Sequence, residues 1–123
     1  MVMYMSESSN SARATPLEVP DRVYARFFSG LADETRMRIV RYLLNGPKTV
    51  GEIVGALGMS QSRISNHLSC LKWCGYVEAE RRGKHVHYRL ADDSIADLIR
   101  TASELVSRNA AHIAVCAQLD LKP

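Results

Sequence analysis

The stretch that most constrains the fold is residues 60–75, SQSRISNHLSCLKWCG, because one short helix there must present several different surfaces. Ser60 is a typical N-cap residue, and Gly75 is a typical helix stop. With about 100° of rotation per residue, three apolar residues fall on one narrow stripe that must face a core. They are Ile64, Leu68 and Leu71. The pattern predicts a helix that is anchored along one side only.

The remaining sides of this helix carry polar groups and thiols. Small polar side chains lie opposite the stripe and can exchange hydrogen bonds without blocking the close approach of another molecule: Ser62, Ser65, Asn66 and Ser69. On the flank between them, Cys70 and Cys74 are spaced i, i+4 and lie about one helical turn apart. Two such thiols can share one soft metal ion. Alternatively, buried free cysteines act as small hydrophobic residues.

Two further helices are predicted directly before this one. Thr49 is expected to cap a helix over residues 50–57, VGEIVGAL, and Gly58-Met59-Ser60 forms a tight turn, which together give a helix-turn-helix pattern. Upstream, Asp33 is expected to cap a helix that ends at Gly46-Pro47. Its buried stripe consists of Ile39, Val40, Leu43 and Leu44.

The period of the sequence changes from helical to two after Gly75. Residues 76–80, YVEAE, and residues 85–90, HVHYRL, are predicted strands joined by the basic turn 81–84, RRGK, so the segment is a β-hairpin. Its cations, Arg81, Arg82 and Lys84, follow a helix of the recognition type. They favour a wing that contacts phosphates or the minor groove, with a solvated turn as the alternative.

Apolar stripes on the first and last helices lack an evident partner within so small a chain. The first helix is expected from Val19 to about Gly30, and the last begins after a cap at Asp92 or Asp93. The apolar residues of the last helix are Ile95, Leu98, Ile99, Ala102, Leu105 and Val106. We assign both stripes to a dimer interface. The predicted fold is mainly α with a β-hairpin wing, a winged helix-turn-helix that forms a homodimer.

Length and composition set the domain organisation. Of 123 residues, 1–16 lack a sustained apolar period and are predicted to be a disordered, mobile tail, 17–110 the folded domain, and 111–123 a C-terminal segment. The net charge of +3 indicates an anionic partner only weakly. Three cysteines without a secretory segment indicate a reducing compartment, the cytoplasm. No apolar run approaches the ~20 residues that span a bilayer, so no membrane partner is expected.

The runs LADETRMRIVRYL and SQSRISNHLSCLKWCGYVEAERRGKHVHYRL resemble the ArsR/SmtB family of dimeric metal-responsive repressors, over roughly residues 19–106. Within this family the chain resembles the cadmium- and lead-sensing branch, which binds its ion through two thiols in the recognition helix and one near the C-terminus. The matching residues are Cys70, Cys74 and Cys116. The Cys-x-Cys of the arsenic- and cadmium-sensing branches is absent, since residues 49–52 read TVGE. Asp97 and His112 match the zinc-sensing branch only in part.

The resemblance implies a repressor that leaves double-stranded operator DNA when a soft ion binds. Three thiolates suit Cd(II) or Pb(II), and also Hg(II) or As(III), whereas Zn(II) usually takes a fourth ligand. We expect His67 and His112 to be structural or solvent-facing. The expected DNA contacts are Ser60, Gln61, Ser62, Arg63, Ser65, Asn66, Arg81, Arg82 and Lys84.

Two other hypotheses remain for the thiols. The first keeps the winged helix and makes Cys70 and Cys74 a redox pair, although a disulfide across one turn of a regular helix is strained. The second is an enzyme that uses Cys70 with His67. A catalytic thiol needs a partner oriented by a third group, and nothing in the sequence supplies one. We therefore predict that the chain is not an enzyme.

Overall fold

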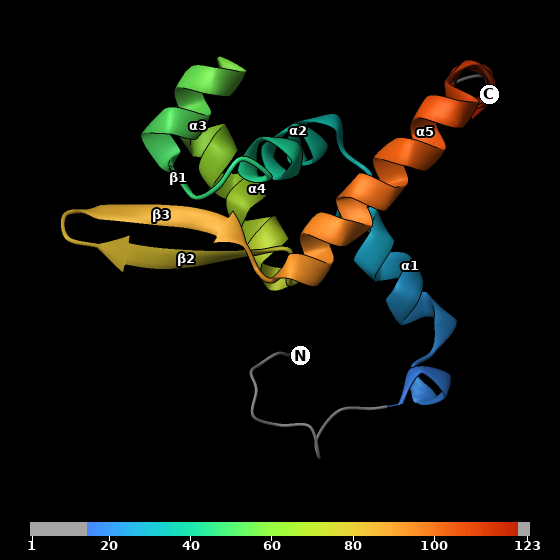
Figure 1. The fold of residues 1–123 in the computed structure, drawn as a ribbon, viewed down its shortest axis with the longest axis horizontal. Coiled ribbons are helices and arrows are strands. Elements are labelled where there is room, and N and C mark those ends of the chain that lie inside the picture. The colour runs from blue at the N-terminus through green and yellow to red at the C-terminus, as the bar shows by residue number, and fades with distance from the viewer. Residues whose placement is uncertain (1–14, 121–123) are drawn as a thin grey trace. The chain divides into compact units, whose positions relative to one another are not determined.

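The computed structural model describes residues 15–120, with side chains described as far as Cys116 (Figure 1). The tail predicted over residues 1–16 lies outside the described residues except for its last two. The chain divides into two compact units, residues 1–91 and residues 92–123. The first unit begins with a 3-10 turn at Pro16–Glu18.

Four helices of the first unit form where the sequence pattern predicts them: α1 (Asp21–Ser29), α2 (Glu34–Leu43), α3 (Val50–Leu57) and α4 (Gln61–Trp73). Two of their caps can be seen directly. Asp33 Oδ2 accepts a hydrogen bond from the Arg36 N–H at 3.0 Å, and Thr49 Oγ1 accepts one from the Glu52 N–H at 3.1 Å. Glu52 Oε1 in turn accepts a hydrogen bond from the Thr49 N–H, which completes a capping box.

The core of the first unit is made by the apolar stripes of three helices, α2, α3 and α4, which contact one another. Each buried side chain is at most 9% exposed, and the set is Ile39, Val40, Leu43, Ile53, Leu57, Ile64, Leu68 and Leu71. Tyr76 and Val77, which follow α4, are also buried. The predicted stripes of α2 and α4 therefore do face a core, with Leu44 only half-buried.

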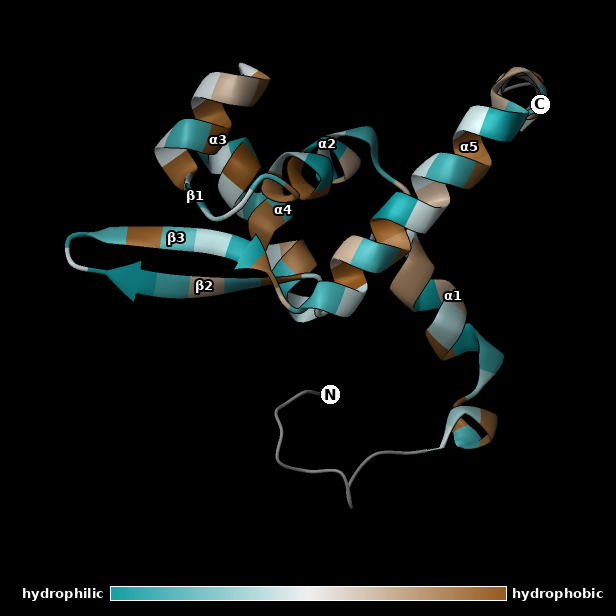
Figure 2. Ribbon diagram, viewed as in Figure 1, coloured by the Kyte–Doolittle hydropathy of each residue, from teal (hydrophilic) through white to brown (hydrophobic). Residues whose placement is uncertain are grey.

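The hairpin belongs to a three-stranded antiparallel sheet with the order β1-β3-β2 (Figure 1). β2 (Val77–Arg82) pairs with β3 (His85–Leu90), and the hairpin residues are mainly hydrophilic (Figure 2). The turn is shorter than predicted, because Gly83 adopts a φ of 61° and closes the hairpin directly after Arg82. The short strand β1 (Lys48–Thr49), which pairs with β3, was not expected from the sequence.

The second unit is the helix α5 (Asp93–Asp120). Asp92 is its cap, since Asp92 Oδ1 accepts a hydrogen bond from the Ser94 N–H at 2.7 Å. The helix is interrupted at Asn109, whose φ of −123° and ψ of 18° are not helical. The Asn109 side chain donates to the Leu105 carbonyl at 2.9 Å, a carbonyl that a backbone N–H would otherwise bind. Among the described residues, no helix is both long and apolar enough to cross a membrane.

Candidate DNA-reading helix and thiol site

The turn between α3 and α4 fixes the direction of α4. Gly58 ends α3 with a left-handed φ of 69°, a conformation that a residue without Cβ adopts without strain. Ser60 then caps α4, because Ser60 Oγ accepts a hydrogen bond from the Arg63 N–H at 3.3 Å. Since the apolar side of α4 is held in the core, the opposite side of the helix remains accessible.

Six of the nine residues expected to contact DNA lie at the amino end of α4, counting its cap Ser60. Five of them are exposed and one, Ser65, is half-buried; the exposed ones are Ser60, Gln61, Ser62, Arg63 and Asn66. The first turn of α4 contains no acidic residue, so the partial positive charge of its amino end is not neutralised locally. This end of α4 favours the approach of a phosphate group.

The wing carries more internal ion pairing than its sequence suggests. Arg81, Arg82 and Lys84 are all exposed. Arg82 Nη2 lies 3.3 Å from Glu80 Oε1, and Arg89 contacts both Glu78 at 2.7 Å and Glu80 at 3.4 Å. The two carboxylates of the wing therefore each meet an arginine, and the charge of Arg82 is partly compensated within the wing.

The predicted metal ligands Cys70 and Cys74 lie half-buried at the carboxyl end of α4. The Cys74 N–H donates to the Cys70 carbonyl at 3.0 Å, so regular helical backbone places the two thiols one turn apart on one side. Burial raises the pKa of the Cys74 thiol above its usual value, and the neighbouring Cys70 thiol raises it further. The charges of Arg26 and Arg36 act in the opposite direction.

The pair fits a soft ion in its chemistry but supplies only two donors. Among the side chains that the structure describes, those of residues 15–116, no three of His, Cys, Asp or Glu are grouped so that they could hold an ion. Cys116 is exposed on the part of α5 that follows Asn109. Thiolates prefer soft ions to the oxygen-seeking Mg²⁺ or Ca²⁺. Trp73, which is 85% exposed, stands next to Cys74 in the sequence.

The histidines have different surroundings. His67 Nδ1 lies 3.8 Å from Asp33 Oδ2 and 3.5 Å from Arg36 Nη1, so it already has polar neighbours on α2 and before it. His112 is exposed on α5. On the wing, His85 is exposed, and His87 is half-buried with a buried Nδ1 that has no hydrogen-bond partner.

Arg36 was not singled out by the sequence pattern. Its guanidinium donates to the Gly30 carbonyl at 2.7 Å and to the Ser29 carbonyl at 3.4 Å, which are the last carbonyls of α1. The same group reaches His67 on α4. Arg36 therefore connects the end of α1 to the helix that carries the thiols. No local sequence signal marks this role, because the acceptors are backbone carbonyls.

The helix α4 is exposed on one side, packs on the core with the other, and is followed by the basic hairpin β2–β3. These features define a winged helix-turn-helix protein, as predicted. The sequence model of the arsR family of bacterial regulatory proteins matches residues 33–79. Together with the similarity to known regulators, this match shows that the chain belongs to the arsR family.

Relatives support the same assignment along most of the chain. A probable mercury resistance operon repressor from Streptomyces lividans is 44% identical over 104 residues, which cover 85% of this chain and 82% of that protein. The NMR structure of the cadmium metal-sensor CmtR from Mycobacterium tuberculosis has a TM-score of 0.57 at 44% identity and covers 68% of this chain and 82% of its own.

A third similar protein is a homodimeric winged helix-turn-helix DNA-binding domain from Mycobacterium bovis. Its solution structure has a TM-score of 0.66 at 30% identity and covers 87% of this chain and 92% of its own. The relatives are named as regulators, repressors and sensors rather than enzymes. The prediction that this chain is a transcriptional regulator and not an enzyme is therefore confirmed.

Proposed function

We propose that the chain is a dimeric repressor that holds an operator when metal-free and leaves it when a soft ion binds Cys70 and Cys74. The observation that carries this proposal is the position of both thiols on α4, the helix whose other side is accessible to DNA. Binding at these thiols acts directly on the reading helix. The mercury resistance repressor and the cadmium sensor among the relatives support a soft ion as inducer.

We propose Cd(II) or Pb(II) as the inducer, ahead of Hg(II) and As(III). Cys116 would supply the third thiolate, and its exposure on α5 leaves it accessible for this role. Three thiolates suit large soft ions, whereas Zn(II) usually takes four ligands. In this proposal residues 17–110 form the DNA-binding and dimerisation domain, and residues 111–123 contribute Cys116.

The DNA interface that we propose consists of the amino-terminal half of α4 and the wing. Side chains of α4 such as Ser62, Arg63 and Asn66 meet base edges or nearby phosphates. Arg81, Arg82 and Lys84 add attraction that is mostly independent of sequence. Ser60 has a second role in this interface, because its hydroxyl also caps the helix. A regulator of bacterial transcription acts where the DNA lies, so we place it in the cytoplasm.

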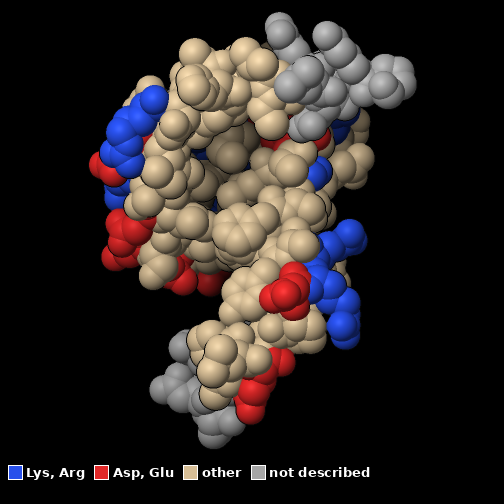
Figure 3. Space-filling view, turned by 90° about the vertical axis from the view of Figure 1, so that its right-hand side faces the viewer, with Lys and Arg blue, Asp and Glu red and all other residues tan. Residues whose placement is uncertain are grey.

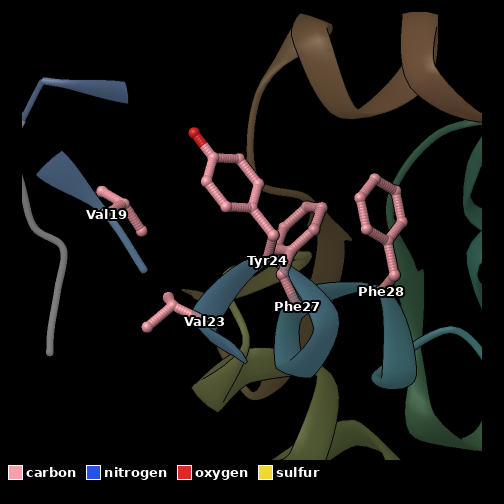
Figure 4. Close-up of a pocket in the computed structure, with 5 residues that line it drawn as sticks. All are labelled: Val19, Val23, Tyr24, Phe27 and Phe28. Carbon is pink, nitrogen blue, oxygen red and sulfur yellow. The ribbon is translucent and has the colours of Figure 1, made fainter. Parts of the chain in front are cut away.

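The proposed dimer interface uses two apolar surfaces that are exposed in the single chain. One is lined by residues of α1 and the residue shortly before it, which surround a surface pocket (Figure 4): Val19, Val23, Tyr24, Phe27 and Phe28. The other lies on α5, where about half of each of these side chains is exposed: Leu105, Val106, Ile113 and Val115. The stripe predicted on this helix is corrected in part, because Ile95 and Ile99 are already buried in the single chain. Uncharged residues predominate on the face that Figure 3 shows. Exposed apolar surface of this kind favours association.

The experiment that tests the proposal is a competition titration. The metal-free protein first selects an operator from random DNA, and labelled operator then reports release by anisotropy while Cd(II), Pb(II), Hg(II), As(III) or Zn(II) is added against a thiol chelator. We expect release by the soft ions at concentrations that leave Zn(II) without effect. Release by peroxide alone, with none by any ion, would replace the metal proposal by the redox alternative.

A further inference from the structure

Gly30, at the carboxyl end of α1, lies directly against the Cys74 thiol. A Cβ added at Gly30 would stand 3.0 Å from Cys74 Sγ and 3.1 Å from the Tyr76 ring. The φ of −62° and ψ of −24° at Gly30 are helical, so alanine would adopt this backbone without strain. A glycine is therefore needed here because a side chain would collide with the Cys74 thiol and the Tyr76 ring, and not because the backbone requires it.

The Tyr76 ring and the carboxyl end of α1 are both held in place by hydrogen bonds. Tyr76 is fully buried, its hydroxyl donates to the Phe27 carbonyl at 2.7 Å, and its ring stacks on the Phe27 ring at 4.7 Å between centroids. On the other side, Arg36 Nε donates to the Gly30 carbonyl at 2.7 Å. These hydrogen bonds therefore hold the last turn of α1 at the place where the Cys74 thiol contacts it.

Resting on the function proposed above, we propose that Gly30 is a positioning residue of the metal site. Because Gly30 has no side chain, the Cys74 thiol packs directly on the backbone of α1, and a displacement of this sulfur toward α1 on coordination meets Gly30. α1 carries the apolar residues Val23 and Phe28, which we assign to the dimer interface. A change at the thiol therefore reaches the dimer interface through α1 as well as through Cys116.

The same contact leads back to the reading helix. Arg36 Nε donates to the Gly30 carbonyl, and Arg36 Nη1 lies 3.5 Å from Nδ1 of His67, which stands in the middle of α4. A shift of Gly30 thus changes the position of a charged group that touches α4. The contacts Cys74 to Gly30, Gly30 to Arg36 and Arg36 to His67 form one continuous set, and such a set transmits a change only if its members move together.

The first test uses the unmodified protein. Amide resonances of glycines are followed by heteronuclear NMR while Cd(II) is added to the metal-free dimer. We expect the Gly30 resonance to shift by more than that of Gly55, a glycine of α3 with nothing within 4 Å of an added Cβ. Equal shifts of Gly30 and Gly55, or a shift of Gly75, which follows Cys74 in the sequence, with Gly30 unmoved, would overturn the inference. No change in any resonance would instead remove the proposed function itself.

The second test adds a methyl group at position 30. Gly30→Ala places a methyl group against Cys74 Sγ, so we expect its affinity for Cd(II), from thiolate absorption, to fall about tenfold, as is typical when a residue supporting a ligand is changed. Gly55→Ala is the matched control and should bind Cd(II) as the parent does. Parental Cd(II) affinity in Gly30→Ala would refute the inference, and if this variant fails to fold the NMR experiment decides.

Discussion

At the scale of single residues, Cys70 and Cys74 can be changed with little effect on anything but their chemistry. Serine keeps the size of cysteine and tolerates the helix, but its hydroxyl is not a soft donor. We expect Cys70→Ser and Cys74→Ser to bind operator as the parent does and to lose the response to metal, a coupling of typically about 1–3 kcal/mol. Cys116→Ser should bind metal less tightly and respond in part.

Operator anisotropy during a Cd(II) titration measures these responses. The control is the same titration without metal, which shows that each variant still holds the operator. A Cys70→Ser, Cys74→Ser protein that left the operator at the parental metal concentration would place the sensing site elsewhere in the chain.

Asp33 is a residue whose charge stabilises the fold. The hydrogen bond from the Arg36 N–H is the main cause that lowers the pKa of the Asp33 carboxyl below its usual value, while burial opposes the shift. Because this pKa is lower in the folded than in the unfolded chain, the stabilisation is fully present above the unfolded value. It is lost as the pH falls through the folded value.

We therefore expect Asp33→Ala to reduce the free energy of unfolding by about 1 kcal/mol at pH 7, the usual value of an N-cap. The difference from the parent should begin to shrink near about pH 4, the usual pKa of an Asp carboxyl, and should disappear as the pH falls through the lower pKa of the folded protein. Urea denaturation at several pH values measures it. Asp33→Asn keeps a capping oxygen and is the control that should lose less. A loss that did not change with pH would mean that the charge of Asp33 is unimportant.

At the scale of elements, we expect the wing to make a measurable contribution to DNA affinity. Replacing Arg81, Arg82 and Lys84 together by Ala should weaken binding to all sequences and flatten its salt dependence by about one unit for each phosphate that the variant no longer neutralises. Of the single variants, Arg82→Ala should have the smallest effect, because Glu80 already pairs with Arg82 at 3.3 Å.

The salt slope is obtained from operator affinities at several salt concentrations. Arg100→Ala, which removes an exposed cation of α5 that pairs with Asp97, is the control for the loss of a cation away from the wing. An unchanged slope in the triple variant would show that the wing does not touch DNA.

At the scale of the whole molecule, we expect a symmetric dimer in sedimentation at micromolar concentration and an operator that is an inverted repeat with half-sites about one or two helical turns apart. Linkage also requires that operator DNA weaken metal binding by the same factor by which metal weakens operator binding. Metal affinity measured with and without operator checks this equality. A monomer with full operator affinity would contradict the dimer.

The sequence predicts the elements whose causes are local. Asp33, Thr49 and Ser60 cap their helices as expected, because a cap depends only on the next three residues. Residues 48–49 become a strand only by pairing with β3, far along the chain, so no local pattern marks them. The interruption at Asn109 is equally invisible to apolar periodicity, since it rests on one side-chain hydrogen bond.

The same distinction applies to the candidate site. The spacing of Cys70 and Cys74 is enough to place two thiols together, because both belong to one helix. The contacts of Cys74 with Gly30, and of Arg36 with the end of α1, join segments distant in sequence. They depend on how the helices pack, which neither spacing nor composition specifies.

The position of Trp73 has an optical consequence. It is the only tryptophan of the chain, and it precedes Cys74 on α4. Spin–orbit coupling to a nearby ion of high atomic number diverts an excited indole from fluorescence to a non-emitting state. We expect the emission of Trp73 to fall linearly with added Hg(II) or Pb(II) until the thiols are filled, and to fall little with the lighter Zn(II). The same titration of Cys74→Ser is the control, and equal quenching there would trace the loss to collisions in solution. Quenching that follows the added ion in this way would make Trp73 a fluorescent reporter of ion binding at the thiols.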